Sequence, residues 1–172
     1  MTMSQPLNPE NNHERFQARL TASHTAVFHV ARWLWSAGNI VELRPSTTAP
    51  THEESMQHID SGDLWYLNPR KQPAEKKLVE VKGSGKDFTC AEDFPFDDMT
   101  VCNKPSFERI APVKPALYVV LNRARTHAGL IDVGNTFLHW TERSQQDPHY
   151  PGHNEVVYQC PKDMVSFREV KY

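Results

Sequence analysis

The sequence predicts a mixed α/β (α+β) fold, with one long helix near the N-terminus and a series of short strands after it. Apolar residues recur at helical spacing between residues 12 and 37. Seven later runs are rich in β-branched and aromatic residues, and each is bounded by turn-forming residues. A long helix followed by a strand meander, a short helix and further strands is typical of the α+β and mixed α/β classes.

The helix is expected over residues 12–37. Its apolar stripe consists of Phe16, Leu20, Val27, Val30 and Leu34. Asn11, followed three residues later by Glu14, resembles a capping box, and Gly38 is a plausible C-terminal stop. We expect residues 1–11 to form a disordered tail. We expect residues 12–172 to form a single domain, because the chain is too short for two ordinary domains.

The strands are expected wherever β-forming residues lie between turn signals. They span residues 39–45, 62–67, 76–83, 99–103, 116–122, 128–133 and 155–160. The polar connection 68–75 contains two prolines and suits an antiparallel hairpin between its flanking strands. A short helix over residues 106–112 is expected before the fifth strand.

Composition excludes several classes of protein. Nineteen basic against 21 acidic side chains give a formal charge of −2, so the whole surface provides no basic field for non-specific nucleic-acid binding. Three cysteines without a C-x-x-C pair indicate neither a disulfide framework nor a zinc knuckle, which favours the reducing cytoplasm. The longest apolar stretch is interrupted by His29 and Arg32, and the N-terminus does not resemble a signal peptide. We therefore expect a cytoplasmic protein without a membrane partner.

The strand 76–83 contains the strongest functional signal. Side chains alternate across a strand, so Val79 and Val81 point to one face while Glu80 and Lys82 share the other. If the preceding hairpin places the strand 62–67 alongside, Asp63 lies near Glu80. Two adjacent carboxylates repel each other unless a cation joins them, and oxygen ligands suit Mg²⁺ or Mn²⁺. The alternative is a solvated strand face with a surface ion pair.

Asp63 in "SGDLWYL" and Glu80 with Lys82 in "LVEVKG" resemble the signature of the PD-(D/E)XK nuclease superfamily. This family is also called restriction-endonuclease-like or Holliday-junction-resolvase-like. The resemblance extends loosely over residues 12–140, and the segment 81–101 is similar to phage-borne members. The proline that gives the motif its first letter is absent, and Gly62 stands before Asp63 in its place.

The resemblance implies a restriction-endonuclease-like core, in which a central mixed β-sheet is flanked by helices. It also implies a Mg²⁺- or Mn²⁺-dependent nuclease acting on DNA. Asp63 and Glu80 would hold the metal together with the Val81 carbonyl, and Lys82 would act on the nucleophilic water. Glu14 is the candidate for a further metal ligand on the helix, although helix capping alone also explains a glutamate there.

Asp60 is an alternative ligand to Asp63, but we expect it to shape the turn that contains Ser61 and Gly62.

Basic residues cluster in sequence around this motif. Arg70 and Lys71 in the hairpin, Lys86 after the strand and Lys104 are candidates for contacts with a nucleic-acid backbone. A merely solvated loop is the alternative for the hairpin residues. RNA stays open as a substrate, a homodimer stays open as the assembly, and a phage-encoded protein would act in the bacterial host cell.

A second class of function competes with the nuclease. The chain would then be a non-catalytic nucleic-acid-binding or protein-interaction protein, for example in phage assembly or counter-defence, that retains the nuclease fold. The complete Asp63, Glu80 and Lys82 set favours catalysis.

Overall fold

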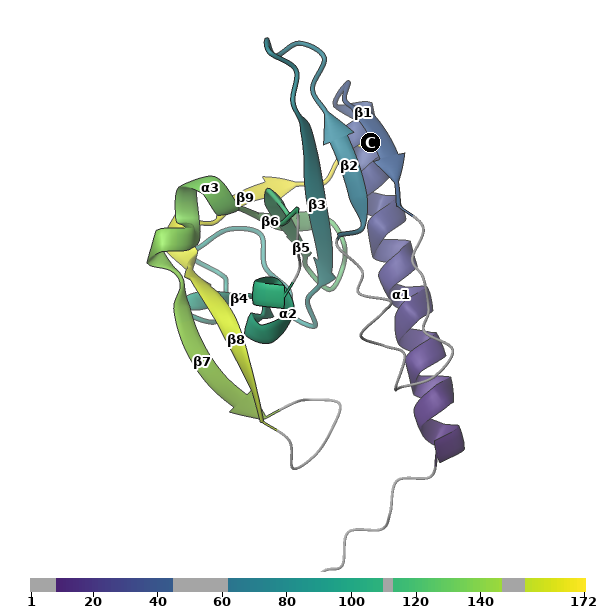
Figure 1. The fold of residues 1–172 in the computed structure, drawn as a ribbon, viewed down its shortest axis with the longest axis vertical. Coiled ribbons are helices and arrows are strands. Elements are labelled where there is room, and N and C mark those ends of the chain that lie inside the picture. The colour runs from purple at the N-terminus through teal and green to yellow at the C-terminus, as the bar shows by residue number, and fades with distance from the viewer. Residues whose placement is uncertain (1–8, 45–61, 110–112, 147–153) are drawn as a thin grey trace, which may run out of the picture.

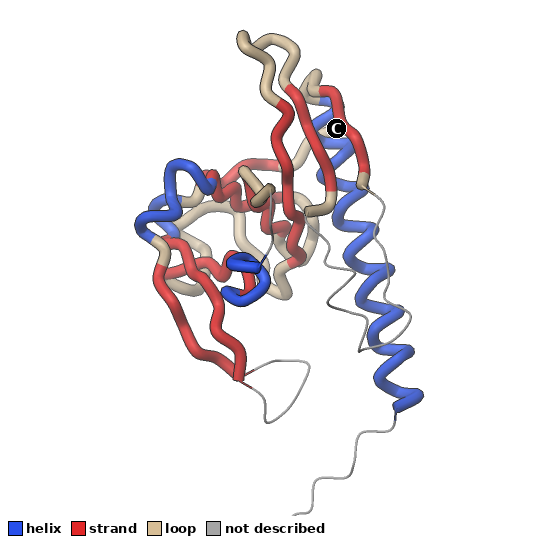
Figure 2. Tube along the Cα trace, viewed as in Figure 1, coloured by secondary structure: helices blue, strands red, loops and turns tan. Residues whose placement is uncertain are grey.

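The computed structural model describes residues 9–44, 62–109, 113–146 and 154–172, with side chains from residue 21 onward. Its architecture is mixed α+β, as the sequence predicts: one long helix, two β-sheets and several short helical turns (Figures 1 and 2). Among the described helices, none is long and apolar enough to cross a membrane.

Helix α1 spans Pro9–Ser36 and begins three residues before the expected start. Proline suits the first helical position, where its missing N–H has no intrahelical partner to lose. Asn11 therefore lies inside the helix, so the expectation that it caps the helix start is wrong. Residues 9–11 of the expected tail are helical, and residues 1–8 lie outside the described part of the chain.

The end of α1 follows the prediction. Gly38 has a φ of 85°, and its N–H donates to the carbonyl of Trp35, while the N–H of Asn39 donates to the carbonyl of Leu34. This pair of bonds is a Schellman motif, which requires a left-handed residue and therefore favours glycine.

The larger sheet has six strands in the order β1-β2-β3-β5-β6-β9. These strands span Ile40–Leu43, Leu64–Leu67, Lys76–Gly83, Leu117–Leu121, His127–Asp132 and Ser166–Glu169. Strands β3 and β5 are parallel, and every other neighbouring pair is antiparallel. The sheet is therefore mixed, with the parallel pair near its centre.

The smaller sheet has the order β4-β8-β7. Its strands span Asp98–Asn103, Asn154–Pro161 and Thr141–Gln146. The short helical segments are α2 (Lys104–Arg109), α3 (Val133–Thr136), η2 (Phe137–His139) and η3 (Lys162–Met164). All seven expected strands are present, whereas β7 and β9 were not predicted. The expected helix over residues 106–112 overlaps α2, and residues 110–112 lie outside the described ranges.

Two hydrophobic clusters cover the two faces of the six-stranded sheet. Val30 of α1 packs in one cluster with Val79 and Val119 of the sheet. On the other face, Tyr118 packs with Met99 of β4 in the second cluster. Figure 1 shows α1 along one side of the large sheet and the small sheet on the other. One face is thus covered by a helix and the other mainly by a second sheet, which differs from a sheet flanked by helices on both faces.

Candidate active site

The pairing of β2 with β3 brings the predicted acids together. Leu64 pairs with Val79 in an antiparallel register, so Asp63 lies opposite Glu80. Asp63, Glu80 and Lys82 all line one hollow of about 410 Å³. We call this space the carboxylate hollow. It lies where β3 ends, and Ala22, Ser23 and Ala26 of α1 form part of its wall. The structure therefore brings the three motif residues to one place.

The glycine that precedes Asp63 has a structural reason. Gly62 is buried and has a φ of 101°, a conformation that proline cannot adopt and that other L-residues adopt only under strain. A Cβ atom at this position would lie 2.8 Å from two side-chain carbons of Leu78. Glycine thus lets the chain enter β2 with Asp63 directed toward β3. This local turn therefore requires glycine rather than proline before Asp63.

The Asp63 carboxylate is fixed by the backbone of the neighbouring strand. Its Oδ2 accepts a hydrogen bond from the Val81 N–H at 2.7 Å, and the Asp63 N–H donates to the Val79 carbonyl at 2.9 Å. The N–H and C=O of one strand residue point to the same edge, so the Val81 carbonyl also points toward the Asp63 side. The two acids and this carbonyl therefore face a common region.

Glu80 and Lys82 form an ion pair, with Lys82 Nζ 2.6 Å from Glu80 Oε1. Their side chains are 20% and 42% exposed, respectively. Burial lowers the pKa of Lys82, but the charge and hydrogen bond of Glu80, with a contribution from Asp63, raise it overall above the ordinary value. Lys82 is therefore positively charged at neutral pH.

The predicted basic residues are distributed over different parts of the fold. Arg70 and Lys71 lie in the β2–β3 hairpin loop, at the opposite end of these strands from the hollow. Lys104 forms ion pairs with Glu142 and Glu108, at 2.6 and 3.7 Å. None of these three basic residues lines the carboxylate hollow.

Lys86 follows β3. Its ammonium lies 5.7 Å from the centre of the Phe96 ring, which lines a second cavity.

Sequence reasoning missed two arginines that do line the hollow. Arg123 and Arg125 follow β5, the strand parallel to β3, so the ends of both strands meet at this edge. The Arg123 guanidinium donates to the Gly85 carbonyl at 2.7 and 2.9 Å and lies 3.7 Å from Asp87. The signal available in the sequence was their position immediately after a buried strand.

The oxygen-rich part of the hollow offers the type of donor that a divalent cation prefers, namely two carboxylates and a main-chain carbonyl. Asp63 accepts a hydrogen bond from the Val81 N–H and Glu80 accepts one from the Lys82 ammonium, and a carboxylate has about four lone-pair directions. No group of three or more His, Cys, Asp and Glu side chains in the described ranges is arranged to hold a metal. Two carboxylates, a main-chain carbonyl and water would instead have to complete the oxygen shell that Mg²⁺ prefers.

Two further candidate ligands lie outside the described residues: the Glu14 side chain, in the first half of α1, and Asp60.

Comparisons of this chain with protein-family models, curated proteins and solved structures find no match. Its function is therefore inferred from its own residues.

Proposed function

We propose that this chain is a divalent-metal-dependent nuclease that hydrolyses DNA phosphodiester bonds, with RNA open as a further substrate. The observation that carries this proposal is the position of Asp63, Glu80 and Lys82 in one hollow, at the end of a buried strand. A surface ion pair would explain Glu80 and Lys82. It would not explain why a second carboxylate, held by the backbone of β3, lines the same space.

The order of elements also supports a restriction-endonuclease-like core. Helix α1 precedes the antiparallel strands β1, β2 and β3, and β5 then pairs with β3 in parallel. Strand β4 and helix α2 lie in the connection between β3 and β5. Helix, strands, helix and strand is the order that the resemblance to the PD-(D/E)XK nucleases implies.

The residues of the hollow suit phosphodiester hydrolysis. In this reaction a water oxygen bonds to phosphorus, one P–O ester bond breaks, and a proton from water goes to the departing oxygen. Mg²⁺ or Mn²⁺, when bound, would supply an activated water and counter the charge on the phosphate. Asp63, Glu80 and the Val81 carbonyl would hold the cation. Lys82 would place a positive charge beside the oxygens on which negative charge increases in the transition state.

The test is cleavage of linear, nicked, supercoiled and branched DNA, and of RNA, with and without Mg²⁺ or Mn²⁺. The matched variant is Glu80→Gln, which keeps the shape of the side chain and removes its charge. We expect metal-dependent products from the parent protein and none from the variant. Absence of metal-dependent cleavage of all these substrates by a folded parent would favour the non-catalytic alternative.

A further inference from the structure

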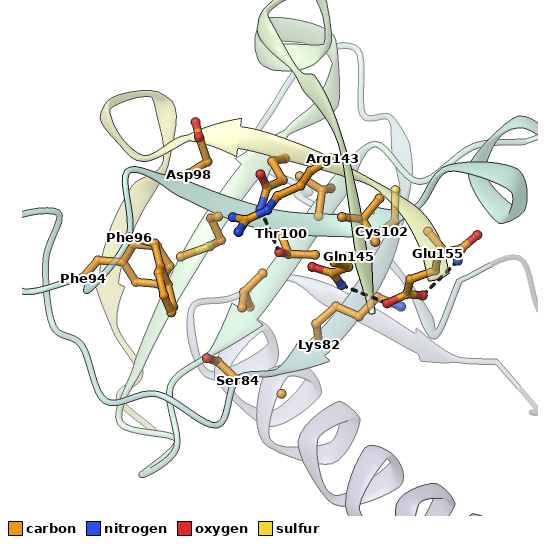
Figure 3. Close-up of a pocket in the computed structure, with 17 residues that line it drawn as sticks. Lys82, Ser84, Phe94, Phe96, Asp98, Thr100, Cys102, Arg143, Gln145 and Glu155 are labelled. Atoms are coloured by element: carbon orange, nitrogen blue, oxygen red, sulfur yellow. Dashed lines mark hydrogen bonds between the residues drawn. The ribbon is translucent and has the colours of Figure 1, made fainter. Parts of the chain in front are cut away.

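A second and larger cavity begins at the proposed catalytic lysine. It measures about 630 Å³ and lies between the end of β3 and the three-stranded sheet. Lys82, Gly83 and Ser84 line both this space, which we call the intersheet cavity, and the carboxylate hollow. Its volume lies within the range of about 300–1,000 Å³ that small-molecule sites occupy. Figure 3 shows Phe94 and Phe96 at one end and Lys82 at the other.

The aromatic end offers a surface on which a planar ring can stack. Phe96 is 49% exposed, whereas Phe94 behind it is 6% exposed. The two rings meet edge to face, with centroids 5.8 Å apart and an interplanar angle of 74°. Lys86, a flexible side chain that a planar ring can displace, lies over Phe96. Accessible aromatic rings near positive charge are surfaces on which unpaired nucleic-acid bases can stack.

The opposite wall supplies amide groups from β4, β7 and β8. Gln145 donates to Glu155 at 2.9 Å, and Asn103 donates to the other oxygen of the same carboxylate at 3.1 Å. Gln159 is buried and approaches the Thr100 hydroxyl at 3.4 Å. An amide carries two N–H donors and one acceptor oxygen, which suits the mixed donor and acceptor edge of a base. Figure 3 shows Gln145 and Glu155 together on this side.

The net charges of the side chains that line the two spaces differ, and this difference favours a base in one space and a phosphate in the other. In the intersheet cavity, Arg143 contributes one positive charge and Asp98 and Glu155 two negative charges, and Lys82, which lines both spaces and is ion-paired to Glu80 in the hollow, brings the sum to zero at most. In the carboxylate hollow, three basic side chains (Lys82, Arg123 and Arg125) face two acids (Asp63 and Glu80), for a sum of +1 before any metal binds. A phosphate is therefore favoured in the hollow and an uncharged aromatic base in the cavity.

We infer that the intersheet cavity binds an unpaired nucleobase of the strand whose phosphate lies in the carboxylate hollow. The inference rests on the proposed function, since it takes the phosphate site beside Lys82 as given. It deepens that function by naming the substrate class. A base in a duplex is stacked and paired, so it reaches a lateral cavity only after leaving the helix. The preferred substrate is single-stranded or locally unpaired nucleic acid.

The experiment measures binding by fluorescence anisotropy without divalent metal, so that no strand is cut. The probes are a labelled 15-nucleotide oligothymidine, an abasic sugar-phosphate chain of equal length, and a 15-base-pair duplex. We expect the oligothymidine to bind most tightly. Phe96→Ala should weaken its binding by about 5- to 150-fold, the effect of losing one stacked base, and leave the abasic chain unaffected. Phe96→Trp, which keeps a stacking ring, should retain the parent affinity.

Two further variants separate stacking from charge. Phe28→Ala removes a phenylalanine that is 61% exposed on α1 and does not line the cavity, so it should leave every affinity unchanged. Arg125→Asn removes a positive charge from the hollow, and asparagine tolerates the φ of 58° at this position. It should weaken the oligothymidine and the abasic chain equally, because both carry the same phosphates.

The inference is overturned if the abasic chain or the duplex binds as tightly as oligothymidine, or if Phe96→Ala weakens both single strands alike. It is also overturned if no probe binds. Cleavage with Mg²⁺ or Mn²⁺ is measured separately on the same protein. Metal-dependent cleavage without base-dependent binding refutes the base site alone. Base-dependent binding without cleavage of any substrate refutes the nuclease proposal and leaves the base site standing.

Discussion

Replacing Lys82 by methionine separates a catalytic lysine from a lysine that only forms an ion pair. Methionine keeps an unbranched stem and removes the charge. If Lys82 acts on charge that develops in the transition state, its loss should slow cleavage by about 10²- to 10³-fold, the usual effect of removing one such group. Its ion partner Glu80 is 20% exposed and Lys82 itself is 42% exposed. A pair this accessible contributes about 0–1 kcal/mol to the free energy of unfolding.

The expected stability change is therefore small. A loss of 1 kcal/mol shifts the melting temperature of a domain of this size by roughly 2–4 °C. The assay compares initial cleavage rates in Mg²⁺ with melting curves followed by circular dichroism.

The matched control for Lys82→Met is Lys76→Met. Lys76 lies on the same face of β3 and is likewise ion-paired, to Glu42 of β1, but it does not line the hollow. Both variants should melt within a few degrees of the parent, and only Lys82→Met should lose activity. If Lys82→Met cleaves as fast as the parent, the lysine is a structural ion partner and the role proposed for it is wrong.

Three further predictions concern metal binding, backbone geometry and pH. Asp63→Asn keeps an acceptor oxygen but loses charge, so Mn²⁺ should raise the melting temperature of the parent and not of the variant; an equal rise in both would exclude Asp63 as a ligand. Gly62→Ala should lower the free energy of unfolding by about 1–3 kcal/mol in urea titrations, because it forces a side chain to a φ of 101°. The control is Gly85→Ala, whose added Cβ meets no atom within 4 Å and should be nearly neutral; equal losses would contradict the strain argument. Hydrogen bonds, first from the Cys90 main chain, lower the pKa of Asp93 to about 2. Asp93→Asn should therefore destabilise the protein above about pH 4, and the difference from the parent should shrink as pH falls from about 4 through about 2; a difference that stays constant between pH 4 and pH 2 would refute this linkage.

The elements that could be predicted from the sequence are those with a strong local pattern. Strand β3 alternates buried valines with Glu80 and Lys82, and its predicted range matches the observed one. Strand β7, in contrast, has the sequence TERSQQ and is mostly exposed. Its pairing with β8 provides the structural support that its own residues do not indicate. A polar edge strand carries little hydrophobic signal, so tertiary context alone reveals it.

The residues of the candidate site likewise include some that local sequence rules could place and some that they could not. Asp63, Glu80 and Lys82 could be placed together because a hairpin and strand alternation are local rules. Arg123 and Arg125 could not, since their approach depends on the parallel pairing of β3 with β5 across an intervening strand and helix. Arg70 and Lys71 illustrate the opposite error. They are close to the motif in sequence, but an extended hairpin carries them to the far end of the strands.

The charge of the whole chain constrains how such a site can hold its substrate. A formal charge of −2 gives no long-range attraction for a polyanion, and the excess in the hollow is a single positive charge. At physiological ionic strength the Debye length is about 8 Å, so even this charge acts only at short range. Under the proposed function, affinity would come from contacts made after the strand has entered: the metal that Asp63 and Glu80 would hold, and a base that would stack on Phe96. Because each contact is short-ranged, losing either should weaken substrate binding strongly, whereas losing a distant basic residue such as Arg70 should weaken it little.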